Sequence, residues 1–383
     1  METRTTYAYR LYPSRAQARH LDATLETARR FYNDLLGERK TAYAERKETV
    51  GLTAQRRRVK ECKATNPHAT GVHSHLLQVV AEDLDRAFRA FFRRLRAGEA
   101  PGYPRFKGRD RFRSVGLKEY GNGFKIDGRR LKLSGIGRVA VRWHRPVEGQ
   151  IKTLRLTRKA GTWYATFSCV VDAQPLPATG RAVGIDVGLH HLLATSDGAY
   201  VEPPHYYREG QRRLRVLQRT VARRTTDSAA RRAAVRRLQR HHERVANQRR
   251  DFLNKVAHRL LTEYDVIALE DLRIRNMVRN RHLAKSILDA GWGYLARHLT
   301  SKAASAGRAV RLVDPAYTSQ DCSACGRRFA GLTLKDRWVR CPACGLSLDK
   351  DHNAAITILR RAGHARPDTT GAVAPVSGEA VGR

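Results

Sequence analysis

Three acidic residues stand inside or beside apolar segments, or at a predicted helix start, where a carboxylate suggests a specific role. Asp186 lies inside the apolar run AVGIDVG, where an unpaired charge is costly to bury. Glu270 ends the apolar run VIAL, and Asp351 stands in DKDHNAA at the start of a predicted helix. Alone, Glu270 could be a surface residue at a strand end, and Asp351 or Asp349 could cap the helix. Together, an acid on a first central strand, an acid ending a later strand and an acid opening a late helix are typical of a ribonuclease-H-like nuclease.

The chemistry of phosphodiester hydrolysis explains why such acids would converge. Two divalent ions about 4 Å apart can activate the attacking water and stabilise the leaving oxygen. Mg2+ prefers oxygen ligands and keeps several of its waters, so a few carboxylates are enough to bind it. We therefore expect Asp186, Glu270 and Asp351 to be the catalytic residues and to hold two Mg2+ ions, with the DNA phosphate supplying further oxygens.

Four of the six cysteines have the spacing of a zinc ribbon. They form two C-x2-C pairs, each followed by a glycine that allows a tight turn: Cys322, Cys325, Cys341 and Cys344. Four thiolates leave no open position on a tetrahedral zinc ion, so the predicted Zn2+ is structural. Because the pairs fall between the second and third acids, the ribbon could brace Asp351. The other cysteines, Cys62 and Cys169, are expected to be ordinary thiols.

The composition favours a nucleic acid as partner. The chain of 383 residues has 74 Lys and Arg against 36 Asp and Glu, a formal net charge of +38. A polyanion neutralises such an excess, and arginine can bind phosphate through two hydrogen bonds at once. The alternative is a general bias of the composition toward arginine. No segment reaches the length of a membrane span and the N-terminus lacks the apolar run of a signal peptide, which predicts a cytoplasmic protein.

The first half of the chain predicts a small β-structure interrupted by helices. Residues 1–13 alternate as in a strand, and residues 15–96 are helical. The apolar face of the last helix consists of positions three and four apart: Leu77, Val80, Leu84, Ala87, Phe88, Phe91 and Leu95. After a basic loop, short strands between residues 114 and 171 predict a small barrel or sandwich, which the first strand joins.

The second half predicts strands that alternate with helices. Residues 181–202 contain two strands with a turn at residues 197–198, and residues 208–261 form an arginine-rich helical hairpin broken at 225–228. A buried strand at 263–272, a basic loop at 274–285, a helix at 286–307 and a strand at 308–315 follow. The cysteine segment leads into a last helix at 351–363, and the remaining tail has no periodic apolar pattern.

These motifs, in this order, resemble the TnpB family of transposon-encoded proteins, which are related to the type V CRISPR effector nucleases. Four segments carry the resemblance: GIDVGLHHLLATSDG, VIALEDL, VDPAYTSQDCSACG and CPACGLSLDKDHNAAITIL. Three more extend it toward the N-terminus: YRLYPSRAQ, LDRAFRAFF and PRFKGRDRFRS. The resemblance covers residues 5 to 361.

The resemblance implies an α/β multi-domain fold. Its nuclease core is ribonuclease-H-like (RuvC-like) with the zinc ribbon inserted, and a helical recognition domain interrupts a β-barrel wedge domain. The implied boundaries are residues 1–13 and 103–178 for the wedge domain, 14–102 for the recognition domain, 179–316 and 347–362 for the nuclease domain, 317–346 for the zinc ribbon and 363–383 for a disordered tail.

The resemblance further implies an RNA-guided DNA endonuclease encoded by an insertion element. Family members bind a guide RNA copied from the transposon end, which pairs with double-stranded target DNA that the nuclease site then cuts. By motif, the catalytic acids are Asp186, Glu270 and Asp351, the last being the second acid of DKD. None of the three is missing, in contrast to the inactivated relatives. The implied assembly is one protein chain with its RNA in the prokaryotic cytoplasm, associated with the nucleoid when bound to DNA.

Three other functions stay open on the sequence alone. A transposase that transfers strands usually has its acids in the order Asp, Asp, Glu, whereas this chain has Asp, Glu, Asp; a tyrosine transposase needs an H-x-H pair, which neither pair of adjacent histidines forms. A nucleic-acid-binding accessory or regulatory protein of transposition would need the charge and the zinc but not the acids. A compact CRISPR effector would share the whole pattern.

Overall fold

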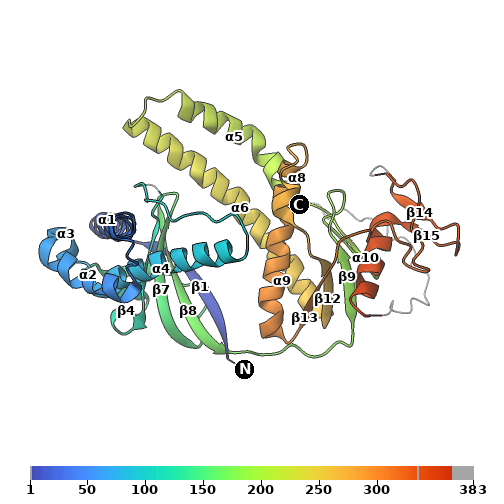
Figure 1. The fold of residues 1–383 in the computed structure, drawn as a ribbon, viewed down its shortest axis with the longest axis horizontal. Coiled ribbons are helices and arrows are strands. Elements are labelled where there is room, and N and C mark those ends of the chain that lie inside the picture. The colour runs from blue at the N-terminus through green and yellow to red at the C-terminus, as the bar shows by residue number, and fades with distance from the viewer. Residues whose placement is uncertain (1, 110, 334–335, 365–383) are drawn as a thin grey trace. The chain divides into compact units, whose positions relative to one another are not determined.

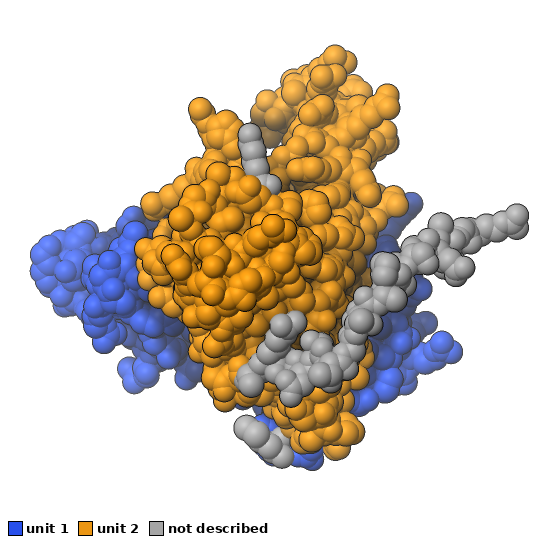
Figure 2. All heavy atoms as spheres, turned by 90° about the vertical axis from the view of Figure 1, so that its right-hand side faces the viewer, with its two compact units in different colours: residues 1–172 blue, residues 173–383 orange. Residues whose placement is uncertain are grey.

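The computed structural model describes residues 2–109, 111–333 and 336–364. The chain forms two compact units, Met1–Asp172 and Ala173–Arg383, which Figure 2 shows in different colours. The predicted disordered tail, residues 363–383, lies outside the described residues from residue 365 onward. Among the described residues, none of the helices combines the length and the apolar character that crossing a bilayer requires.

An eight-stranded sheet organises unit 1, in the order β2-β7-β8-β1-β6-β5-β4-β3. The first strand joins this sheet, as predicted, and pairs antiparallel with both β8 and β6. The end strand β3 contacts β7 near the other end, so the sheet curls like a barrel. The strands are β1 (Glu2–Tyr12), β2 (Ser114–Leu117), β3 (Glu119–Tyr120), β4 (Gly123–Asp127), β5 (Arg130–Leu133), β6 (Gly137–Arg142), β7 (Gln150–Lys159) and β8 (Thr162–Asp172).

Four helices are inserted between β1 and β2: α1 (Arg15–Arg46), α2 (Leu52–Thr65), α3 (Pro67–Thr70) and α4 (Ser74–Arg96). Local residues decide where they begin. The Ser14 hydroxyl accepts from the Gln17 backbone N–H and the Gln17 side chain accepts from the Ser14 N–H, which caps α1. The Asn66 side chain caps α3, whose first residue is Pro67.

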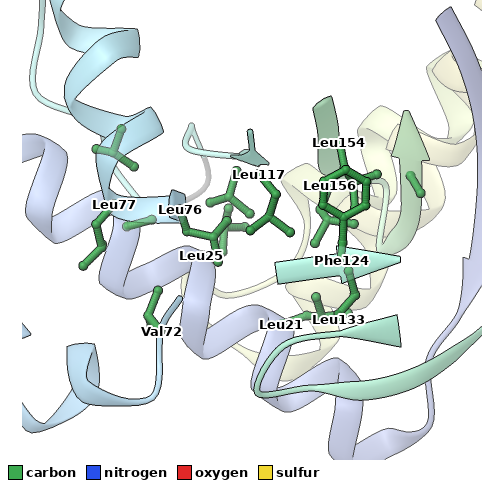
Figure 3. Packing of buried hydrophobic residues seen from close by; sticks show 14 of the residues in the cluster. Leu21, Leu25, Val72, Leu76, Leu77, Leu117, Phe124, Leu133, Leu154 and Leu156 are labelled. Atoms are coloured by element: carbon green, nitrogen blue, oxygen red, sulfur yellow. The ribbon is translucent and has the colours of Figure 1, made fainter. Parts of the chain in front are cut away.

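The core of unit 1 lies between these helices and the sheet (Figure 3). Leucines of α1 and α4 belong there to the same buried cluster as Leu154 and Leu156 of β7. The predicted apolar face of α4 is confirmed for Leu77, Val80, Leu84 and Phe88, which are buried. It is wrong for Leu95, which is 54% exposed. The reason is tertiary, because the end of α4 lies beyond the core cluster and packs through Phe88 and Phe91 on the Tyr103 ring.

Unit 2 is built on a five-stranded sheet in the order β11-β10-β9-β12-β13. Strands β9, β12 and β13 run parallel, and β10 and β11 are antiparallel to their neighbours. The bounds are β9 (Ala182–Asp186), β10 (Leu193–Thr195), β11 (Tyr200–Val201), β12 (Val266–Glu270) and β13 (Ala309–Val313). The prediction of two strands at 181–202 was therefore wrong. A loop after Asp186 separates β9 from β10, so the segment forms three.

The helices of unit 2 include a long basic hairpin, α5 (Tyr206–Ala222) and α6 (Ala229–Glu263), which projects away from the sheet in Figure 1. The others are α7 (Ile274–Met277), α8 (Ala284–Ala290), α9 (Trp292–Ala306) and α10 (Lys350–Arg361). Two predictions are corrected here. The loop expected at 274–285 contains α7, and the helix expected at 286–307 breaks at Gly291, whose φ of 77° ends α8 in the left-handed region.

A buried arginine ties the start of unit 2 to its sheet. The Arg308 side chain is 2% exposed and forms an ion pair of 2.6 Å with Asp265. It also donates to the carbonyl oxygens of Leu261 and Pro177, at 2.9 and 2.7 Å. Asp265 in turn accepts from the backbone N–H of Thr179 at 2.9 Å. This network holds the segment before β9, and thereby the strand that carries Asp186.

We expect Arg308→Ala to lower the free energy of unfolding of unit 2 by about 3 kcal/mol, because it leaves Asp265 and two carbonyl groups without their buried partner. Thermal or urea unfolding of the purified protein measures this change. Arg259→Ala is the matched control, because Arg259 is exposed and lies 3.9 Å from Glu263 within one helix. Its expected cost is below about 0.5 kcal/mol. Equal costs for the two variants would contradict the role given to Arg308.

Candidate active site

Asp186 and Glu270 end two adjacent parallel strands. Ile185 of β9 lies opposite Leu269 of β12 in the parallel register, and Asp186 and Glu270 are the next residues. Both carboxylates therefore emerge side by side at the carboxyl edge of the sheet, and both residues are partly buried. The carboxyl edge is where open sheets of parallel strands place their ligands.

Helix α10 brings Asp351 to the same edge. The helix packs directly on β9, where a Cβ added to Gly184 would lie 2.0 Å from the Ala355 carbonyl oxygen, so a residue with a side chain would force the helix away. Asp351 lies in the first turn of α10. A Cβ added to Gly188, two residues after Asp186, would lie 4.0 Å from Asp351 Oδ2. The structure thus brings all three predicted acids together at one end of β9.

The charges of Glu270 and Asp351 both disfavour a charged Asp186. Burial, followed by the charges of Glu270 and Asp351, raises the pKa of Asp186 from its ordinary value of 3.8 to about 8. Burial also raises the pKa of Glu270, against the opposing effects of a hydrogen bond from Thr318 and the charge of Arg361. Like charges held together at low exposure favour either a proton or a cation between them, and such shifts are typical of functional sites.

The donors fit hard divalent ions. All are carboxylate oxygens, the ligands that Mg2+ prefers. Among the described residues, the four cysteines are the only group of three or more potential ligands whose atoms lie within 4.8 Å of one another. The carboxylate oxygens of the three acids lie farther apart than the ligands of a single shared ion would. A pair of ions about 4 Å apart has a correspondingly wider span of ligands.

Asp349, the first acid of DKD, has a different task from Asp351. Its Oδ1 accepts from the backbone N–H of Asp351 at 3.0 Å and of His352 at 3.1 Å, so it caps α10. The Tyr200 hydroxyl also bonds to Asp349; burial first, and then this carboxylate, raise the pKa of Tyr200. Asp349 is therefore engaged in fixing the helix end. Asp351 Oδ2 lies 3.5 Å from Arg337 Nη1, and the Asp351 charge raises the pKa of Asp186 more than the Asp349 charge does.

Two supporting side chains escaped the sequence analysis. The Thr318 hydroxyl, which is buried, donates to Glu270 Oε1 and orients that carboxylate. Tyr200 holds the cap of α10 from the neighbouring β-hairpin. Thr318 stands in the segment VDPAYTSQDCSACG, which carries part of the family resemblance, but no spacing or periodicity connects it with Glu270.

The four cysteines form one cluster, as predicted. Cys322 Sγ lies 3.6 Å from Cys344 Sγ, and Cys325 Sγ lies 3.6 Å from Cys341 Sγ. These separations are too long for disulfides, whose sulfurs lie about 2 Å apart. Four sulfurs bound tetrahedrally at about 2.3 Å from a zinc ion lie about 3.8 Å from one another. The cluster is thus compatible with a structural zinc ion.

The cysteine cluster is joined to α10, the helix that carries Asp351. Buried Asn353 accepts from the Ser323 backbone N–H and donates to the Asp321 carbonyl oxygen, both at 2.9 Å. On the other side, β14 (Trp338–Arg340) pairs with β15 (Ser347–Asp349), which runs directly into α10. The cysteine segment therefore holds α10 both at its start and at buried Asn353 in its first turns.

The raised pKa of Asp186 makes the metal-free protein sensitive to pH. A carboxyl whose pKa is 3.8 unfolded and about 8 folded keeps a proton in the folded state that the unfolded state has lost. Stability is therefore lost as the pH rises from about 4 to about 8. We expect Asp186→Asn, which cannot ionise, to stabilise the metal-free protein by on the order of 2 kcal/mol at pH 8.5 and by much less at pH 5.

Thermal unfolding in a chelator at the two pH values measures this effect. Asp251→Asn serves as the control, because Asp251 is exposed on α6 and pairs with Lys255 at 2.8 Å. It should change stability little at either pH. A gain for Asp186→Asn that is the same at pH 5 and pH 8.5 would contradict the repulsion described here.

Models of known families match three parts of the chain. The OrfB family of IS605 elements, described as "Probable transposase", matches residues 166–281. The TNB domain of Cas12f1-like proteins matches residues 292–358, which include the cysteine cluster. A domain of the same OrfB family described as helix-turn-helix matches residues 1–48. In this structure the described residues of that last segment form β1 and the single helix α1.

Individual relatives agree with these matches. A candidate RNA-guided DNA endonuclease of Streptomyces pristinaespiralis is 34% identical over 94% of this chain and 89% of its own length. The candidate RNA-guided DNA endonuclease InsQ of Escherichia coli K12 is 34% identical over 76% of this chain and 75% of its own length. The TnpB-like protein L79 of Acanthamoeba polyphaga mimivirus is 29% identical over 32% of this chain and 24% of its own length.

A solved structure shares the fold. The Cas12f1 chain of a Cas12f1–sgRNA–target DNA complex superposes with a TM-score of 0.60 over 90% of this chain and 83% of its own length, at 13% sequence identity. The fold is thus a mixed α/β, multi-domain fold like that of Cas12f1, with a four-cysteine cluster. From the family models and the relatives together, this chain belongs to the TnpB family, the OrfB proteins of IS605-type insertion elements.

Proposed function

We propose that this protein is an RNA-guided DNA endonuclease that hydrolyses target DNA with two Mg2+ ions held by Asp186, Glu270 and Asp351. The observation that carries the proposal is the convergence of these three acids, with the pKa of Asp186 raised by burial and by its neighbours. A cluster of repelling acids at the carboxyl edge of a sheet has no structural benefit of its own. It becomes favourable when cations bind.

The topology of unit 2 supports a ribonuclease-H-like core. In chain order its strands lie 3-2-1-4-5, with the first three antiparallel and the last two parallel to the first. We assign the RuvC-like nuclease domain to residues 179–316 and 347–362 and the zinc ribbon to residues 317–346. In unit 1 we assign the wedge domain to the curled sheet and the recognition domain to α1–α4, which interrupt it.

The guided part of the proposal draws on relatives and on charge. Two relatives that span most of this chain carry the name RNA-guided DNA endonuclease, and the Cas12f1 chain was solved with sgRNA and target DNA. The net charge of +38 suits a protein that holds an RNA and a DNA together. In such systems base pairing supplies the sequence specificity and the protein holds the paired strands by their backbone. The arginine-rich hairpin α5–α6 is one surface suited to this task.

The residues of the site divide the work. When bound, the two Mg2+ ions supply an activated water and stabilise the leaving oxygen. Asp186 would hold an ion as its charged carboxylate, and the Thr318 hydroxyl keeps Glu270 in orientation. Asp349 and Asn353 hold the start of α10, so Asp351 is presented without the entropic cost of ordering a loop.

Sequencing the RNA that copurifies with the protein tests the guided part. The expected result is one defined transcript that ends at the flank of the gene's own insertion element. DNA carrying a match to that RNA should then be cut in the presence of Mg2+. Random RNA fragments would contradict the guide, and binding of the matched DNA that never leads to cutting in Mg2+ would contradict the nuclease and favour an accessory or regulatory role.

A further inference from the structure

A strip of exposed aromatic rings lies on unit 1, outside every site described above. Phe92 at the end of α4 is 47% exposed, and Tyr103 and Phe106 in the following loop are 42% and 52% exposed. Phe91 links the first two rings, because its ring centroid lies 5.1 Å from that of Phe92 and 5.2 Å from that of Tyr103. Phe106 follows Tyr103 by three residues in the same loop. We refer to Phe92, Tyr103 and Phe106 as the aromatic strip.

The loop that carries the strip is held in place. The side chain of Asn33 on α1 accepts from the Lys107 backbone N–H at 2.8 Å and donates to the Lys107 carbonyl oxygen at 3.1 Å. Arg29 of α1 donates to the same carbonyl oxygen at 2.8 Å. The loop backbone next to Phe106 is thus held on α1, and the Tyr103 ring packs on Phe88 and Phe91 of α4. These contacts lower the cost of ordering this surface on binding.

Positive charge surrounds the strip. Residues 89–113 contain nine Arg or Lys against two acids, Glu99 and Asp110. Arg93 and Arg96 stand in the last turn of α4 beside Phe92. The Lys40 ammonium lies 5.1 Å from the centroid of the Phe106 ring. Flat exposed rings interleaved with cations form the kind of surface on which unpaired bases stack while their phosphates are neutralised.

We propose that the aromatic strip binds single-stranded nucleic acid by base stacking, an inference that rests on the proposed function and adds one contact to it. A duplex is a poorer partner, because its bases are already stacked on one another and would engage only the cations. A second copy of this chain is also a poorer partner. A symmetric contact would place two segments with this excess of Arg and Lys face to face.

The test measures the binding of a fluorescent 12-nucleotide poly(U) RNA and of a 12-base-pair DNA duplex to the full-length protein, freed of copurified nucleic acid and kept without Mg2+. We expect Phe106→Ala and Tyr103→Ala each to weaken poly(U) binding by about 10-fold and to change duplex binding by less than about 2-fold. Tyr103→Phe, which keeps the ring, should bind like the parent. Since no cleavage is measured, the outcome is independent of whether the three acids cut DNA.

Leu95→Ala is the matched control within the same surface. Leu95 is exposed on α4 beside the strip but has no ring, so base stacking does not use it and poly(U) binding should stay unchanged. Equal losses for Leu95→Ala and Phe106→Ala, with a dimer of the parent chain seen by analytical ultracentrifugation, would overturn the proposal in favour of a second copy. Equal losses of poly(U) and duplex binding in the ring variants would overturn it in favour of a contact made by charge alone.

Discussion

The Asp186→Ala protein is expected to bind its RNA and its DNA target as the parent does and to leave the DNA uncut. Asp186 ends β9, which pairs with β12, the strand of Glu270, and packs at Gly184 against α10, the helix of Asp351. Its loss removes a ligand of the proposed metal site. Such ions stabilise the transition state of phosphodiester hydrolysis by several kcal/mol, so cutting should fall about 1000-fold or more. Gel analysis of a matched plasmid in Mg2+, beside a filter-binding assay with the RNA, measures both properties.

Three further variants sharpen this prediction. Asp251→Ala removes an exposed acid of α6 and should cut like the parent. Asp351→Ala should be as inactive as Asp186→Ala, whereas Asp349→Ala should lose only part of the activity, because Asp349 acts through the cap of α10. If Asp351→Ala were fully active and Asp349→Ala inactive, the assignment would be reversed, with Asp349 as the catalytic acid and Asp351 as the supporting one. Normal cutting by Asp186→Ala would end the case for this site.

The elements that carry the acids could be predicted because their signals are local. The apolar runs before Asp186 and Glu270 are short and continuous, as in strands covered on both faces. The spacing of the cysteines likewise predicts their cluster, since a C-x2-C pair brings two thiols to one side of a turn. The residues of each strand, and of each C-x2-C pair, lie within a few positions of one another.

The features that could not be predicted from the sequence depend on contacts between residues far apart in the chain. Gly184 looks like any strand glycine in the sequence. A side chain is excluded at this position by the carbonyl oxygen of Ala355, which lies far along the chain. Arg308 resembles the many surface arginines, although it is buried against Asp265. Leu95 continues the helical spacing of α4 but lies past the end of the core. The spacing of apolar residues shows which face of a helix or strand is apolar. The elements packed against that face decide how far along it the residues are buried.

Cys341→Ser is expected to release the zinc ion and to reduce cutting about 100-fold while RNA binding is kept. Cys341 is buried in the cluster, 3.6 Å from Cys325 in the other pair, so the variant breaks the link between the two halves of the ribbon. The ribbon holds α10 through Asn353 and β15, and a shift of about 1 Å in a metal ligand can cost about 100-fold in rate. Zinc content by mass spectrometry and plasmid cutting measure the two effects.

Cys62→Ser is the matched control, because Cys62 is a half-buried thiol in unit 1 that takes no part in the cluster. It should keep one zinc ion per chain and full cutting. Limited proteolysis separates a structural from a catalytic role: in the Cys341→Ser protein, cleavage by trypsin should rise between residues 317 and 349 while β9 and β12 stay protected. If the zinc-free protein cut DNA normally, the ribbon would not be needed to position Asp351, and the contacts of α10 with β9 around Gly184 would have to suffice.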